Sequence, residues 1–181
     1  MLDEKLVQYC SPTLAGLKAG SLFSCAYAGA EDRLEFRTAN RQLAQKGLRL
    51  IPLRIRGGRA LTYLYRPSEL QKALNVPAAC ALLEELGYGG LTSEECLICL
   101  RRKLQAGGDF PHEIGLFLGY PAEDVRGFMA DTAACTCTGC WKVYGDAAEA
   151  QRLFDLYACC TSCYQNQLKS GTSLSRLAVA V

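Results

Sequence analysis

Two Cys-x-x-Cys pairs in the last third of the chain have a spacing that suits metal binding. Cys137 and Cys140 form the first pair, Cys160 and Cys163 form the second, and nineteen residues separate the pairs. Four thiolates at such a spacing are typical of a structural zinc site. Cysteine thiolates also hold iron–sulfur clusters. Zinc and an iron–sulfur cluster are therefore the candidate cofactors.

An alternative is that these cysteines are buried or idle thiols. The segment between the pairs favours a strand followed by a helix, whereas a zinc ribbon has a hairpin there. Cys160 also falls on the apolar stripe of that helix, together with Leu153, Tyr157 and Tyr164. Cysteine is among the residues most often buried in protein cores, so both interpretations stay open.

The only histidine, His112, is followed directly by Glu113. Histidine can transfer a proton near neutral pH, and a neighbouring carboxylate can orient its ring. Polar and apolar residues alternate over Trp141–Tyr144, so Lys142 and Tyr144 should share one face of a strand, toward a cleft or solvent. We take His112, Glu113 and Lys142 as candidate catalytic residues. The alternative is that His112 and Glu113 only open a helix, because helix N-termini favour acidic side chains.

The clearest element that could position such residues is a β-hairpin over residues 48–66. Ile51, Leu53 and Ile55 alternate with polar residues and Pro52, and Gly57-Gly58 supplies the turn. Pro52 cannot donate a ladder hydrogen bond, which predicts an edge strand or a bulge. Three arginines fall on its polar face, where they form a solvated surface or an anion site: Arg54, Arg56 and Arg66.

The remaining pattern predicts an α+β fold with a small antiparallel or mixed sheet of about four strands. Further strands are expected at 21–27 and 141–144, and 174–181 is either a last strand or a frayed end. Helices are expected at 3–10, 31–46 (with Leu34 and Leu43 inward), 67–74, 78–86, 92–105, 111–118 and 121–130, and from 146 to the mid-160s. Thr92 and Asp146 each begin a capping box. We expect one domain over residues 1–181.

Composition excludes several functional classes. Half of the 181 residues are hydrophobic, which is globular rather than disordered composition, and the net charge is only +2. A nucleic-acid partner is therefore not expected. No apolar run reaches the roughly 20 residues of a membrane helix. The first residues do not resemble a signal peptide, so we expect a cytoplasmic protein.

Several motifs carry a resemblance to a known family. They are Ser11–Lys18 (SPTLAGLK) with Ser21–Phe23, Tyr65-Arg66, Pro111–Pro121 (PHEIGLFLGYP) with Glu123–Val125, and Gly139–Asp146 (GCWKVYGD). Together they resemble the domain of unknown function 3793 family, found mainly in clostridial and related anaerobic bacteria. The resemblance covers nearly the whole chain and implies a cytosolic bacterial protein, but no activity. The polar residues that correspond to its motifs are Thr13, Lys18, His112, Glu113, Asp124 and Lys142.

Polar residues in motifs far apart along the chain imply one shared pocket. The leading hypothesis is a small anionic ligand bound between the Pro111–Gly115 (PHEIG) and Trp141–Tyr144 (WKVY) motifs, with Thr13, Lys18 and Tyr144 as further ligand-binding residues. The alternatives are the cysteine metal site and a protein-interaction module without chemistry. The sequence names no protein partner and leaves open whether the chain is an enzyme.

Overall fold

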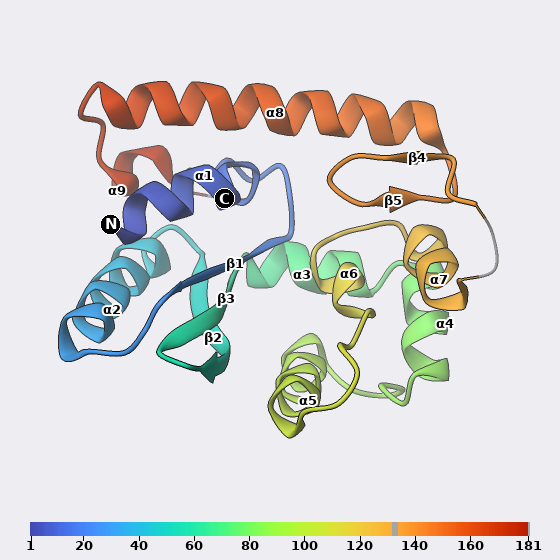
Figure 1. Ribbon diagram of the computed structural model, residues 1–181. Helices are drawn as coiled ribbons and strands as arrows, with labels where there is room; N and C mark the ends of the chain where they lie inside the picture. Colours follow the sequence, from blue (N-terminus) through green and yellow to red (C-terminus); the bar gives the residue numbers. More distant parts are fainter. Residues whose placement is uncertain (132–133, 181) are drawn as a thin grey trace. The chain divides into compact units, whose positions relative to one another are not determined.

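The computed structural model describes residues 1–131 and 134–180, in two compact units (Figure 1). Unit 1 comprises Met1–Glu69 and Tyr157–Val181, and unit 2 comprises Leu70–Leu156. Two helices cross the boundaries along the chain, α3 (Pro67–Leu74) and the long α8 (Ala147–Lys169). The expectation of one domain over residues 1–181 stays a prediction.

Unit 1 contains a three-stranded antiparallel sheet in the order β1-β3-β2. The strands are β1 (Gly20–Ala26), β2 (Arg49–Arg56) and β3 (Arg59–Tyr65). Gly57 and Gly58 both have positive φ and form the turn between β2 and β3, because a residue without Cβ adopts this conformation at little cost. The predicted hairpin is confirmed, and the fold is α+β.

Pro52 lies in the edge strand β2, at the point where its pairing with β3 shifts register. β2 pairs with β3 alone, so it is an edge strand, and the pairing register shifts between Pro52 and Arg54. A central strand forms ladder hydrogen bonds with neighbours on both sides, and a proline has no backbone N–H to donate to either ladder. Both consequences expected of this proline, an edge position and a bulge, are present.

The helices α1 (Leu2–Leu14), α2 (Ala30–Ala44) and α9 (Leu174–Leu177) pack with this sheet into one core. Leu6, Leu14, Leu43 and Leu64 are fully buried in it. Two expectations were wrong here. Leu34 points outward, with 66% of its surface exposed, and the C-terminal segment expected as a strand or frayed end begins with the short helix α9.

Arg66 was expected on the polar face of the hairpin, and this expectation is wrong. The residue is only 1% exposed and is not part of a solvated face. Its guanidinium donates to four backbone carbonyls: Thr13 at 2.9 Å, Leu14 at 2.7 Å, Lys46 at 3.1 Å and Val179 at 2.7 Å. The arginine therefore joins the C-terminal end of α1, the segment after α2 and the C-terminal tail. Arg56, on the hairpin, is exposed as expected.

Unit 2 consists mainly of helices: α4 (Pro77–Glu85), α5 (Ser93–Ala106), α6 (Ile114–Phe117) and α7 (Ala122–Ala130). A two-stranded antiparallel ribbon follows, β4 (Cys137–Thr138) with β5 (Lys142–Val143). Thr92 caps α5 through a capping box with Glu95, as the sequence predicts. The Asp146 carboxylate accepts hydrogen bonds from Ala148 and Glu149 at the start of α8. Within the described ranges, no helix combines the length and apolar character needed to cross a membrane.

Candidate functional site

The helices α6 and α7 are joined by a tight turn that depends on two glycines. Gly119 has φ 78°, and the N–H of Tyr120 bonds back to the carbonyl of Gly115 at 2.9 Å. A Cβ built on Gly115 would lie 2.7 Å from a Val125 methyl carbon, closer than real side-chain contacts. Only glycine therefore allows α6 to approach α7 this closely, and the two short helices expected within 111–118 and 121–130 are present.

Asp124 holds α7 against the segment Trp141–Gly145. Its carboxylate is buried and accepts three hydrogen bonds: from the Trp141 indole N–H at 2.7 Å, the Tyr144 N–H at 2.7 Å and the Gly145 N–H at 2.8 Å. A buried carboxylate is tolerated when its oxygens are fully bonded in this way. Because Trp141 and Val143 are buried, Lys142 between them is turned outward, as the alternation predicts.

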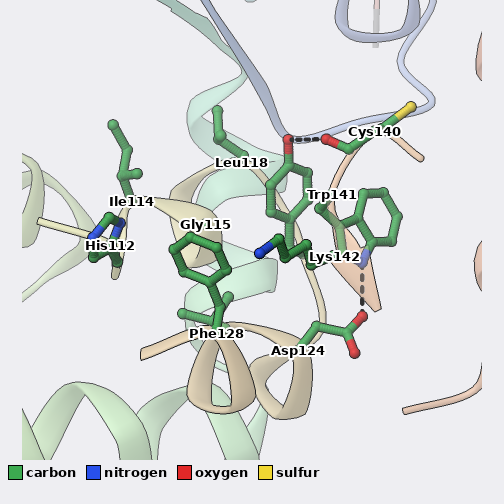
Figure 2. Close-up of a pocket in the computed structure, with 11 residues that line it drawn as sticks. His112, Ile114, Gly115, Leu118, Asp124, Phe128, Cys140, Trp141 and Lys142 are labelled. Atoms are coloured by element: carbon green, nitrogen blue, oxygen red, sulfur yellow. Dashed lines mark hydrogen bonds between the residues drawn. The ribbon is translucent and has the colours of Figure 1, made fainter. Parts of the chain in front are cut away.

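A cavity of about 220 Å³ lies where these segments meet, and its walls are mostly apolar (Figure 2). Tyr120 and Trp141 stack with ring centroids 4.6 Å apart, and Trp141 also contacts Phe154 in an edge-to-face arrangement. Aromatic and aliphatic side chains that line the cavity are Ile114, Leu118, Tyr120, Val125, Phe128 and Trp141.

Two basic side chains also line the cavity, His112 from the segment before α6 and Lys142 from β5. The Phe128 ring lies between them: its centroid is 4.9 Å from that of His112 and 5.5 Å from Lys142 Nζ. In Figure 2 the amino group of Lys142 extends toward the side where Phe128 and His112 lie. Within residues 1–131 and 134–180, neither the imidazole nor the ammonium forms a hydrogen bond or ion pair. Their donors are therefore available to a ligand.

Glu113, the third candidate catalytic residue, is engaged at a different place. Its buried carboxylate accepts from the Tyr88 hydroxyl at 2.9 Å and forms an ion pair with Lys103 Nζ at 2.8 Å. Burial alone would raise the pKa of this carboxyl, but the bonds from Lys103, the backbone N–H and Tyr88 outweigh it and lower the pKa below its usual value. Burial and the bond to Glu113 raise the pKa of the Tyr88 hydroxyl. Glu113 therefore connects α5 to the start of α6 and is not among the residues that line the cavity.

The three predicted ligand-binding residues make contacts elsewhere and do not line the cavity. Thr13, in unit 1, shares a buried hydrogen bond of 2.8 Å with Ser21. Lys18, also in unit 1, has its ammonium 6.0 Å from the Tyr157 ring centroid. Tyr144 packs against α7, where a Cβ on Gly127 would lie 2.4 Å from its ring. The structure therefore brings together His112 and Lys142 from the predicted set.

The cysteine pairs belong to different units, with Cys137 and Cys140 in unit 2 and Cys160 and Cys163 in unit 1. Burial and the neighbouring thiols Cys163 and Cys159 raise the pKa of Cys160 to about 11, which disfavours the thiolate that a metal needs. Among the residues with a described position, no group of three or more His, Cys, Asp or Glu side chains is arranged to hold a metal ion. The zinc and iron–sulfur hypotheses stay predictions.

Sequence reasoning identified the two basic groups but missed the rings around them. Phe128 falls within the helix expected over 121–130 and Tyr120 falls between two expected helices, positions that do not suggest a binding role, yet both line the cavity. Phe128 is 39% exposed, so its ring is not part of the buried core of unit 2. Its place beside two basic residues depends on the turn at Gly119 and the anchor at Asp124, which the spacing of residues does not reveal.

Comparison with known proteins shows the family of the chain. No curated protein and no solved structure matches it. One family model matches residues 6–178, a range that includes nearly all of both units and each motif described above. The chain therefore belongs to the family described as a protein of unknown function (DUF3793).

Proposed function

We propose that this chain binds a small anionic organic ligand in the unit 2 cavity that His112 and Lys142 line. The observation that carries the proposal is the state of these two side chains. Both supply N–H donors at one apolar cavity, and both lack a hydrogen-bonded or ionic partner among the described residues. Ligand sites combine such apolar walls with a few polar groups that fix orientation.

The charged group that a ligand can reach in the cavity favours an anion. The Asp124 carboxylate also lines the cavity, but it is buried and its oxygens already accept three N–H bonds. The Lys142 ammonium is exposed and has no ionic partner among the described residues, so it is the charge that remains available to a ligand.

The proposal is limited to binding because of where Glu113 lies. Proton transfer by His112 with Glu113 as its orienting partner requires contact between the two side chains. The Glu113 carboxylate is instead bonded to Tyr88 and Lys103.

We also propose the bacterial cytoplasm as the compartment, because all eleven cysteines are free and thiols persist in reducing surroundings.

Calorimetric titration with acetate, benzoate, inorganic phosphate and phenyl phosphate tests the proposal. We expect at least one of these anions to bind the full chain saturably, and Lys142→Met to weaken its affinity about tenfold or more, as loss of a charged hydrogen bond does. The matched control is Lys169→Met, which removes an exposed lysine from the end of α8 in unit 1. Equal affinity in both variants, or no binding of any of the four anions, would overturn the proposal.

A further inference from the structure

The cavity indicates which class of anion it accepts. Its volume of about 220 Å³ is below the range of roughly 300–1,000 Å³ typical of pockets for drug-sized ligands. A cavity of that size has space for about one ring and one short charged group. The walls and the donors must therefore be matched by two parts of a single small molecule.

The walls of the cavity favour a planar ring. Phe128 and the stacked pair of Tyr120 and Trp141 all contribute to its lining. In the view of Figure 2, Phe128 and Trp141 lie on opposite sides of Lys142. Aromatic rings attract one another in offset-stacked or edge-on arrangements beyond the gain from burial alone. A ligand ring packed against one of these side chains would extend contacts that the protein already makes among its own rings.

The donors of the cavity favour a carboxylate over a phosphate. Proteins commonly bind phosphate with arginine forks or with backbone N–H groups at a helix N-terminus. The N–H groups of Tyr144 and Gly145 are occupied by Asp124. Lys142 supplies a single point charge, which suits a monoanionic carboxylate, and the Phe128 ring separates it from the second donor, His112.

We infer that the ligand is an aromatic carboxylate, with its carboxylate at Lys142 and its ring against the aromatic wall that Phe128 contributes to. This inference rests on the proposed function, because it names the chemical class of the anion for the same cavity. Phe128 is then the residue that determines specificity: its ring is part of the wall and separates the two donors.

Trp141 makes the inference directly measurable, because it is the only tryptophan of the chain and it lines the cavity. Its fluorescence is titrated with benzoate, cyclohexanecarboxylate, acetate and the neutral analogue benzamide. We expect benzoate to bind at least about threefold more tightly than cyclohexanecarboxylate, which has a similar apolar size but no planar π-face and no ring quadrupole. Acetate and benzamide should each bind about tenfold more weakly than benzoate, because each lacks one of the two matched parts.

The variant Phe128→Leu keeps an apolar side chain and removes the ring. It should lower benzoate affinity about threefold to tenfold and leave acetate affinity within about twofold. If phenyl phosphate or inorganic phosphate binds in a Lys142-dependent way and benzoate does not, the carboxylate class is wrong while anion binding stands. If cyclohexanecarboxylate equals benzoate in both proteins, the aromatic selection is wrong. If no anion depends on Lys142, both proposals fail.

Discussion

At the scale of single residues, the two buried carboxylates of unit 2 are stabilised in different ways. Asp124 is bonded by three neutral N–H donors, while Glu113 has a phenol and an ammonium as partners. Asp124 thereby positions Trp141 and the strand that carries Lys142. Glu113 positions the segment that carries His112. Neither acid needs to touch a ligand to be required for the shape of the cavity.

Glu113 gives a prediction about the pH dependence of stability. Burial opposes the charged form, but the bonds from Lys103, a backbone N–H and Tyr88 outweigh it and lower the pKa of Glu113 in the folded chain below its usual value. A group with a lowered folded pKa stabilises the fold above the unfolded-state pKa, and this contribution is lost as the pH falls through the folded-state pKa. We expect Glu113→Gln to lower the free energy of unfolding at neutral pH by about 1–3 kcal/mol.

Urea unfolding at neutral pH and at about pH 3 measures this contribution. The difference between wild type and Glu113→Gln should shrink toward acid, because wild-type Glu113 becomes protonated there. Glu94→Gln, which neutralises an exposed acid on α5, is the control and should change stability little. A difference that stays constant with pH would contradict the assigned role of the Glu113 charge.

At the scale of elements, the close approach of α6 and α7 shapes one side of the cavity. We expect Gly115→Ala to destabilise the chain by about 1–3 kcal/mol, because its Cβ would collide with Val125 and approach Tyr120 to 3.2 Å. Gly89→Ala is the matched control, since its Cβ would be 3.5 Å from Glu84 and its φ is not positive. Thermal unfolding compares the two variants, and equal melting temperatures would show that the α6–α7 contact adapts to a larger side chain.

The elements with strong local signals could be predicted from the sequence. The hairpin at β2 and β3 followed from alternation and Gly57-Gly58, and Pro52 indicated both the sheet edge and the bulge. The capping box at Thr92 set the start of α5. Tertiary packing determined what was missed: Leu34 occupies an inward position by periodicity but has no core beside it, and it is exposed.

The candidate site could be predicted only in part, for a related reason. His112 and Lys142 attracted attention as rare or well-placed polar types, and they do line one cavity. Glu113 is adjacent to His112 along the chain, but adjacent residues at a helix start point in different directions, and its carboxylate bonds to Tyr88 and Lys103. Aromatic residues such as Phe128 carry no signal that separates a core position from a cavity wall.

At the scale of the molecule, Arg66 connects segments of unit 1 that lie far apart along the chain. Its donors bond to carbonyls of α1, of the segment after α2 and of Val179 near the C-terminus. A lysine cannot reproduce this fork, because its ammonium is a single point. We expect Arg66→Lys to lower the free energy of unfolding by about 1–3 kcal/mol, since buried carbonyls lose their donors.

The control for this prediction is Arg56→Lys, at an exposed arginine on the hairpin. It should leave the urea midpoint nearly unchanged, because exposed surface substitutions have small effects. The susceptibility of the C-terminal tail to carboxypeptidase gives an independent readout and should rise in Arg66→Lys alone. Stability and proteolysis equal to those of wild type would show that the bond to Val179 is unimportant.

The central claim is that an anion binds in the cavity that His112 and Lys142 line, and the single histidine of the chain makes it testable by proton NMR. The imidazole Cε1–H resonance of His112 is followed during titration with whichever anion calorimetry finds to bind most tightly. We predict that this resonance moves saturably with the calorimetric affinity, and that Lys142→Met shifts the movement to about tenfold higher anion concentration or beyond while Lys169→Met leaves it in place. Binding heat without movement of the His112 resonance would place the anion elsewhere and contradict the claim.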